Sequence, residues 1–384
     1  MITFRTGSLL HRLITLLASV GEFPTQSLRL LGNERELKEL TAKLTQPQTI
    51  RNPQTGESIT LTKAISVSGK GKYKTIRLYK SAIPILKWIH AEEYYVGAFR
   101  SHKVSGGIAH IERNHRVAES IAMFFGAGFE FREYKIPQLQ VSEIRQVELS
   151  YASFYSARCL KQLGNDETNK TMYSRAVGAV FAGNVCYAVY NTRNAVMKWC
   201  GKGECKAKLN TLEIARMNFG INDLDSAILF GESDDIAVAT IEETEHNEKL
   251  NLRFDGIYGH IHFIPMNETG LRQLALFAVR DLKERLLDLL FEPEQRSYDC
   301  GVFEYDAYIN GVYVLSYLDA DIARLMRFKS VQDKLRYKCE VLCFADQVSF
   351  LKKYLDELAE IRVIERDAVE SALNLKRRYI FEED

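Results

Sequence analysis

The stretch Ser68-Gly69-Lys70-Gly71-Lys72 separates two segments, residues 58–68 and 73–79, that are rich in Thr, Ile, Val and Tyr. A glycine-containing turn between two segments of this composition is typical of a β-hairpin. The turn itself carries two lysines. The sequence therefore predicts a hairpin with a basic tip.

Three helical segments are predicted before this hairpin. Apolar residues recur at intervals of three and four between residues 8 and 20, which predicts an amphipathic helix that ends at Gly21. Pro24 suits the first turn of a second helix over residues 25–31. Asn33, with Glu36 three residues later, has the position of an N-cap for a third helix. Three helices followed by a basic hairpin predict a winged helix-turn-helix domain over residues 1–100.

The distribution of charge predicts the partner of this segment. The first ninety residues hold 14 Lys and Arg against five Glu and no Asp, a local charge of +9 in a chain whose total is +1. A basic end on an otherwise acidic chain indicates a polyanion, and double-stranded DNA is the partner that we expect. The alternative is a winged helix that binds protein. The residues expected to contact phosphates are Lys70, Lys72, Lys74 and Arg77, and those best placed for the major groove are Asn33, Arg35, Lys38 and Lys43.

The remainder of the chain predicts a second domain. Ser101–Gly107 has the composition of a linker, so we place a boundary near residue 102 and expect a domain over residues 101–384, with a possible further boundary near residue 150. Helical and extended patterns alternate there, with a strand expected over residues 236–241 and one long helix over 268–291. The pattern indicates a mixed α/β domain, and the whole chain is expected to be of the α+β class.

The composition of the chain also indicates where in the cell the protein is expected. No window approaches twenty uninterrupted apolar residues, and the seven cysteines are odd in number and scattered. We therefore expect a cytoplasmic protein that does not bind membranes. The pairs Cys200 with Cys205 and Cys339 with Cys343 lack a histidine at ligand spacing, which favours buried thiols over a zinc site.

One segment has the residue types of a catalytic site. It reads Asp255-Gly-Ile-Tyr-Gly-His260-Ile-His262-Phe-Ile-Pro-Met-Asn267. In a strand, His260 and His262 point to the same face, where two imidazoles are suited to a divalent ion such as Mg2+ or Mn2+. The motif resembles that of the HUH enzymes, which nick single-stranded DNA with a tyrosine, and Asp255 and Asn267 match acidic and amide positions of some relaxases. Histidines at this spacing also occur as structural residues in half-buried strands.

The tyrosine that such an enzyme needs is not in the usual place. Residues 268–291, which follow the histidines, contain none. A second catalytic pattern, Glu204-Cys205-Lys206, has the Glu-x-Lys of restriction-type nucleases, but no acidic residue lies between Arg175 and Lys202 to complete it. No phosphate-binding loop is present either, because Gly201-Lys202-Gly203-Glu204 lacks the required spacing. The tyrosines left as candidate nucleophiles are Tyr151, Tyr155, Tyr298, Tyr305 and Tyr308.

As a whole, the chain resembles the replication-relaxation family of plasmids and integrative elements of Gram-positive bacteria. The resemblance rests on the predicted winged helix, the segment Asn114-His115-Arg116-Val117-Ala118-Glu119 and the mixed α/β domain that follows. It implies a role in plasmid replication or mobilisation at a specific double-stranded site, with replication or conjugation proteins as further partners. For Asn114, His115 and Arg116 themselves, we favour a helix cap and a packing role over nucleic-acid contact.

Three functions follow from these observations. The first is a sequence-specific DNA-binding protein of a mobile element, which needs no cofactor and could be a homodimer on a symmetric site. The second is a relaxase-like enzyme that nicks DNA with a metal held by His260 and His262. The third is a transcriptional regulator whose C-terminal domain senses a ligand in a pocket lined by Trp199, Tyr258 and Phe263.

Overall fold

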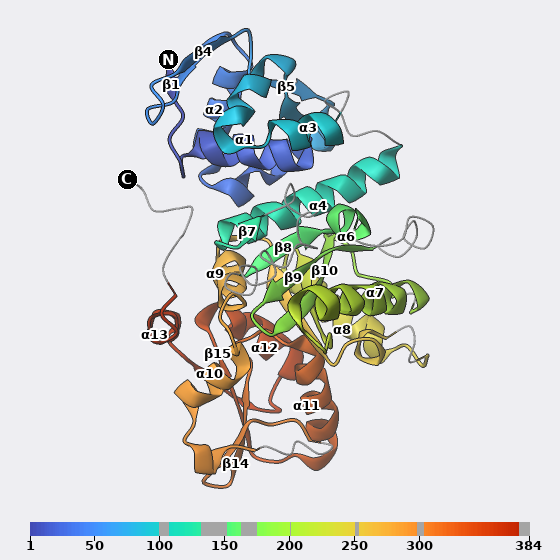
Figure 1. The fold of residues 1–384 in the computed structure, drawn as a ribbon. Coiled ribbons are helices and arrows are strands. Elements are labelled where there is room, and N and C mark those ends of the chain that lie inside the picture. The colour runs from blue at the N-terminus through green and yellow to red at the C-terminus, as the bar shows by residue number, and fades with distance from the viewer. Residues whose placement is uncertain are drawn as a thin grey trace. The chain divides into compact units, whose positions relative to one another are not determined.

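The computed structural model describes residues 1–99, 107–131, 152–162, 175–199, 201–249, 253–297 and 303–375. The chain divides into two compact units, one of residues 1–136 with 378–384 and the other of residues 137–377. Helices and several small sheets make a mixed α+β protein, as the sequence predicts (Figure 1). No helix among the described residues combines the length and the apolar character needed to cross a membrane.

The predicted helices of the first unit are confirmed. Helix α1 (Leu9–Val20) begins at Ser8, whose side chain accepts a hydrogen bond from the backbone N–H of His11, and its apolar face is buried. The second segment is the 3-10 helix η1 (Thr25–Leu31) rather than an α-helix. Helix α2 (Glu34–Leu44) begins at Asn33, whose side chain accepts hydrogen bonds from the two backbone N–H groups expected for a cap.

Two small sheets complete the first half of this unit. Strand β6 (Thr75–Leu78) lies between β2 (Phe23–Pro24) and β5 (Ile65–Ser68), and η2 (Gly71–Tyr73) lies at the tip of the antiparallel β5–β6 hairpin. The expected strand over residues 58–68 is interrupted, because Ala64 turns back to bond the carbonyl of Leu44. Its first part forms the other sheet, which consists of β1 (Ile2–Thr3), β3 (Gln48–Arg51) and β4 (Ser58–Leu61).

Helix α4 (Ile108–Gly126) also belongs to the first unit, beyond the boundary that we expect near residue 102 (Figure 1). It packs against α1, η1 and β2. Buried polar contacts fix this packing: the hydroxyl of Ser27 donates to Glu119 Oε1 at 2.5 Å, and His115 Nε2 lies 3.4 Å from Glu22 Oε1. The linker expected at residues 101–107 lies outside the described residues apart from Gly107. The unit also contains η3 (Lys80–Ile89), α3 (Glu92–Ala98) and β7 (Glu130–Phe131).

The second unit contains a mixed sheet with the strand order β12-β11-β10-β9-β8. Strands β8, β9 and β10 are antiparallel neighbours. Strands β10, β11 and β12 run parallel and are linked by helices. Every residue of β9 is buried, as expected for a strand covered on both faces. The elements are β8 (Ser153–Ser156), α6 (Ala157–Gln162), β9 (Ala176–Ala182), β10 (Val185–Arg193), α7 (Lys202–Phe219), β11 (Ser226–Gly231), α8 (Asp234–Glu245), η6 (Phe254–Gly256) and β12 (His260–Pro265).

A second sheet follows in this unit, with the order β13-β14-β15-β16. Strands β13 and β14 form an antiparallel hairpin, and β14, β15 and β16 are parallel. The elements are α9 (Glu268–Leu276), α10 (Leu282–Leu290), η7 (Pro293–Gln295), β13 (Ala307–Ile309), β14 (Val312–Ser316), α11 (Ile322–Leu335), β15 (Cys339–Cys343), η8 (Ala345–Gln347), α12 (Val348–Leu355), β16 (Glu360–Val363) and α13 (Arg366–Ala372).

Two sequence-based assignments in this unit are wrong. Residues 236–241 belong to helix α8, not to a strand, because the acidic first turn at Asp234 and Asp235 starts a helix there. The long helix expected over residues 268–291 is two helices, α9 and α10. The chain changes direction between them at Asp281, whose backbone has a positive φ of 53°.

Both sheets of the second unit have the same order of elements. A hairpin is followed by helix, strand, helix, strand and helix, as β9-β10-α7-β11-α8-β12-α9 and then as β13-β14-α11-β15-α12-β16-α13 (Figure 1). Helices at matching positions contact each other: Tyr354 of α12 donates to Glu245 of α8 at 2.7 Å, and Arg272 of α9 pairs with Glu370 of α13 at 2.8 Å. The second unit is thus two similar α/β halves packed together.

Candidate functional site

The predicted phosphate-contacting residues lie on or beside the β5–β6 hairpin. Lys70 and Lys74 are exposed, whereas the side chain of Lys72 lies outside the described residues. Arg77 is half-buried and donates from Nε to the hydroxyl of Ser66 at 3.1 Å, so it is less available than the two lysines. The segment from Ser58 to Ala91 holds seven Lys and Arg and no acidic residue, which concentrates the positive charge of the first unit here.

Helix α2 presents a more balanced charge than we expect for a groove-reading helix. Asn33 caps the helix with its side-chain oxygen, which accepts from Arg35 N at 3.0 Å and Glu36 N at 3.3 Å. Arg35 pairs with Glu39 at 3.3 Å. Lys38 pairs with Glu34 at 2.6 Å, while Lys43 is exposed. The prediction from sequence chose the basic residues of this helix and used Glu36 for the cap, but left out Glu34 and Glu39, which pair with two of those basic residues.

A hollow of about 950 Å³ lies between these elements of the first unit. Helical residues on one side and the β5–β6 hairpin on the other line it, and three lysines are among them. Lys38 comes from α2, Lys63 precedes β5 and Lys74 precedes β6. The hollow therefore brings predicted groove and phosphate residues to one surface.

The two histidines of β12 lie on one face of the strand, as predicted. Their rings are nearly parallel, with an interplanar angle of 11° and centroids 6.4 Å apart, and Ile261 between them is buried. Each Nδ1 is already engaged. His260 Nδ1 lies 2.6 Å from Asp321 Oδ2, and His262 Nδ1 lies 2.9 Å from the carbonyl oxygen of Asp319.

Asp321 is the centre of this arrangement. Its Oδ1 accepts from the backbone N–H of Ile261 at 3.1 Å and from Ala323 and Arg324 at 3.0 and 3.2 Å, so it also caps helix α11. Burial alone would raise its pKa, but the hydrogen bond from His260 and the positive charges around it hold the pKa well below the ordinary value. The same hydrogen bond raises the pKa of His260 despite its partial burial.

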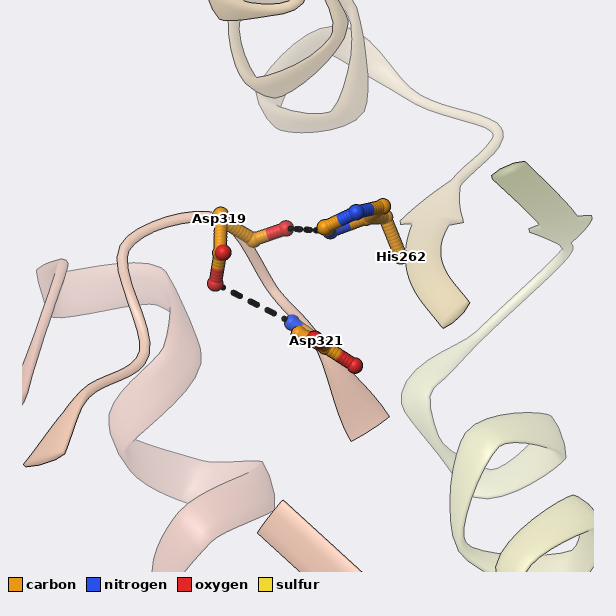
Figure 2. Close-up of side chains that lie close together, drawn as sticks. All are labelled: His262, Asp319 and Asp321. Carbon is orange, nitrogen blue, oxygen red and sulfur yellow. Dashed lines mark hydrogen bonds between the residues drawn. The ribbon is translucent and has the colours of Figure 1, made fainter. Parts of the chain in front are cut away.

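His262, Asp319 and Asp321 have ligand atoms within 4.8 Å of one another, the spacing of a cation site (Figure 2). Hydrogen bonds already hold these residues in place. A carbonyl oxygen only accepts, so His262 Nδ1 donates to the carbonyl oxygen of Asp319, and each oxygen of Asp321 accepts at least one hydrogen bond. The donation from Nδ1 leaves Nε2 as the ring nitrogen through which His262 would bind an ion. His260 is not a member of this group. The cluster fastens residues 319–321 to the edge of β12, where Phe263 N also bonds the carbonyl of Ala320 at 3.0 Å.

The other residues of the expected nicking site do not converge on the histidines. Asp255 pairs with Arg253 at 2.7 Å, and Asn267 caps α9. Tyr155 is buried in β8, and Tyr305 and Tyr308 pack on the ring of Tyr313. The rings of Phe277 and Tyr187 pack on His262, with centroids 4.8 and 5.8 Å away. Burial raises the pKa of Tyr187, which is opposite to the activation of a nucleophile. The remaining candidates, Tyr151 and Tyr298, lie outside the described residues.

The cysteine pairs and the Glu-x-Lys triplet do not form the sites that their sequence patterns suggest, as far as the described residues show. Cys339 and Cys343 are buried on β15, and burial raises the pKa of their thiols to about 11 and about 12. Cys200 lies outside the described residues. The Glu-x-Lys triplet lies in helix α7, where Glu204 is buried 3.4 Å from Arg175.

The expected aromatic pocket is not formed by its three predicted residues together. Tyr258 and Trp199 are core residues: the Tyr258 hydroxyl lies 2.9 Å from that of Tyr190, and the Trp199 ring packs on both tyrosines. Phe263 instead lines a separate cavity with Tyr317 and Phe350. No sequence pattern predicts that cavity, because its residues come from both halves of the unit.

The segment that carries the family resemblance is part of the packing of α4. Asn114 lies inside the helix rather than at its cap, and its amide donates to the carbonyl of Val20 at 3.3 Å. Comparisons with protein-family models, with curated proteins and with solved structures found no match for this chain.

Proposed function

We propose that the first unit binds double-stranded DNA, and that the protein is a sequence-specific DNA-binding protein of a plasmid or integrative element that acts in replication or mobilisation. The observation that carries the proposal is the basic β5–β6 hairpin beside the exposed face of α2. A helix and a hairpin that meet at one surface are the parts with which winged helices bind DNA.

The order of elements supports a winged helix. Helix α1 is followed by β2, η1 and α2, and then by the hairpin, with β6 between β2 and β5. In this arrangement α2 is the third helix and enters the major groove, while the loop between β5 and β6 is the wing. The β3–β4 hairpin is an insertion between α2 and β5.

The hairpin and helix α2 differ in how their charged residues would contact DNA. Lys70 and Lys74 on the hairpin have no acidic neighbours in the surrounding sequence, so they supply phosphate contacts and most of the salt-dependent affinity. Arg35 and Lys38 must leave Glu39 and Glu34 to contact bases. Exposed ion pairs of this kind contribute only about 0–1 kcal/mol, so their exchange for DNA contacts costs little.

The role in a mobile element rests on the resemblance of the chain to the replication-relaxation family. In this chain, the segment from Asn114 to Glu119 would hold α4 against the elements that precede α2. Its contacts are with Val20 of α1, with Glu22 and with Ser27 of η1. Its contribution to DNA binding is then indirect. Recognition of a particular site depends on α2.

The test is the affinity of the full chain for duplex DNA, measured by fluorescence anisotropy over a series of salt concentrations. The double variant Lys70→Ala/Lys74→Ala should bind at least about tenfold more weakly and lower the salt slope by about 2, one for each lost phosphate contact. The control is Lys334→Ala/Lys352→Ala, which removes two exposed lysines of the second unit. Equal affinity and slope in both double variants would refute the proposal.

Specificity needs a separate measurement. Selection of bound sequences from a random duplex pool should yield a defined site, and Lys43→Ala in α2 should change base preference at particular positions more than overall affinity. A pool that shows no enrichment would leave only non-specific binding and would contradict a site-specific role.

A further inference from the structure

A cavity of about 200 Å³ lies in the second unit where strands of both sheets end. The segments after β11, β12, β14 and β15 line it, and these segments lead into the helices α8, α9, α11 and α12. The carboxyl ends of parallel strands are where open α/β sheets bind ligands. Here the two similar halves contribute strand ends to one cavity.

Acidic side chains give the cavity its charge. Glu232, Asp234 and Asp346 line it, and no basic side chain does so among the described residues. Asp346 is neutralised from outside the lining by Arg366, which donates two hydrogen bonds of 2.6 and 2.8 Å. The carboxylate of Asp234 has no hydrogen bond or ion pair with any described residue, although it is half-buried. Burial, followed by the charges of Asp346 and Asp235, raises its pKa.

The second feature of the cavity is the hydroxyl of Tyr317. The side chain lines the cavity and is only 3% exposed, yet its oxygen has no hydrogen-bond partner in the described part of the chain. A hydroxyl oxygen that faces a cavity without a protein partner can accept a hydrogen bond from a bound ligand. Burial and then the charge of Asp234 raise the pKa of Tyr317, so the hydroxyl stays protonated. Its ring stacks on Phe350 with centroids 5.7 Å apart.

We propose that this cavity binds a small organic cation, a primary amine whose ammonium group lies between the carboxylate of Asp234 and the hydroxyl oxygen of Tyr317. An ammonium group has three donors and no acceptor, so it satisfies both oxygens at once, and its hydrogen bond to a carboxylate is charge-assisted. The rings of Phe263 and Phe350, which also line the cavity, provide apolar contact for the carbon chain.

The cavity restricts the ligand further. Drug-sized ligands occupy roughly 300–1,000 Å³, so a cavity of about 200 Å³ takes a smaller molecule. Anions are disfavoured by Glu232 and Asp234, which line the cavity and have no basic partner among the described residues. This site is independent of DNA binding by the first unit, and its test does not depend on that proposal.

The experiment uses the full chain and two probes of equal length, butylamine and the neutral 1-butanol. Isothermal titration calorimetry and thermal unfolding should show saturable binding and stabilisation by butylamine, and neither effect with 1-butanol at the same concentrations. Absence of saturable amine binding, or equal effects of the two probes, would overturn the proposal.

Variants locate the site. Asp234→Asn keeps the shape of the side chain and removes its charge, and should lower the affinity for butylamine at least about tenfold. Tyr317→Phe keeps the stacked ring and removes the hydroxyl oxygen, and should lower the affinity for butylamine severalfold. The matched control is Asp235→Asn, the next residue of α8, which is exposed, pairs with Lys353 and does not line the cavity. Binding by Asp234→Asn at the affinity of the control would overturn the assignment, and circular dichroism checks that each variant is folded.

Discussion

Nδ1 of His260 lies 2.6 Å from Oδ2 of Asp321, which follows it by 61 residues and belongs to the other half of the second unit. The same carboxylate bonds three backbone N–H groups through its other oxygen. One aspartate thus joins strand β12 to the start of helix α11. This contact gives His260 a structural partner in the other half of the unit.

Replacement of Asp321 should destabilise the second unit. Asp321→Ala leaves the three backbone N–H groups and His260 without their acceptor, and should cost about 3–5 kcal/mol of unfolding free energy. Asp321→Asn retains an amide oxygen for the N–H groups and should cost clearly less. Urea unfolding followed by the fluorescence of Trp199, in a Trp88→Phe background, measures both. Equal losses for the two variants would contradict the capping role.

The pairing of His260 should make stability depend on pH. Since the pKa of His260 is higher in the folded protein than in the unfolded chain, its contribution is full below the unfolded pKa of about 6.5 and is lost as pH rises through the folded pKa. Asp321, with its depressed pKa, stays ionised over this range. The stability difference between the wild type and His260→Gln should therefore be larger at pH 5.5 than at pH 9. In an Asp321→Asn background this pH dependence should disappear.

Nicking of DNA is expected to be absent. Asp255, Asn267 and the described candidate tyrosines contact residues other than the two histidines. We therefore expect incubation with supercoiled DNA and Mg2+ or Mn2+, followed by SDS and protease, to leave the DNA supercoiled. The control is the His260→Ala/His262→Ala variant, which should give the same result. A tyrosine-linked nick that this double variant loses would establish the enzyme instead.

Two glycines of the hairpin tip should differ in their effect on DNA affinity. Gly69 has a φ of +78°, and a Cβ there would lie 2.1 Å from the carbonyl oxygen of Tyr73, so Gly69→Ala must distort the hairpin. Gly71 also has a positive φ of +55°, but its Cβ position is open. Gly69→Ala should weaken DNA binding severalfold more than Gly71→Ala. Indistinguishable affinities would argue against a wing built on this turn.

The helices of the first unit were accessible from sequence because their signals are local. Apolar spacing places α1, and Asn33 with its two bonded N–H groups fixes the start of α2. The break near Ala64 was not accessible, because it depends on a hydrogen bond to Leu44, twenty residues earlier. Residues 236–241 have the Val and Ile content of a strand, but the acidic first turn of α8 and the packing of α8 on α11 and α12 both favour a helix.

The site was predictable only in part. Strand periodicity correctly placed His260 and His262 on one face, since alternate residues of a strand share a side. Their partners Asp319 and Asp321 lie far along the chain, and no spacing rule joins them to the histidines. The same holds for Asp234 and Tyr317, which meet only because strands from the two halves end at one cavity.

Residues 319–321 have a consequence for how the second unit folds. They continue the chain from β14 of one sheet and also lie along β12 at the edge of the other, where His262 and Asp321 form a backbone bridge. Loss of either sheet removes hydrogen-bond partners from the other. The two halves, despite their matching order of elements, should therefore melt in one cooperative transition rather than as two independent folding units.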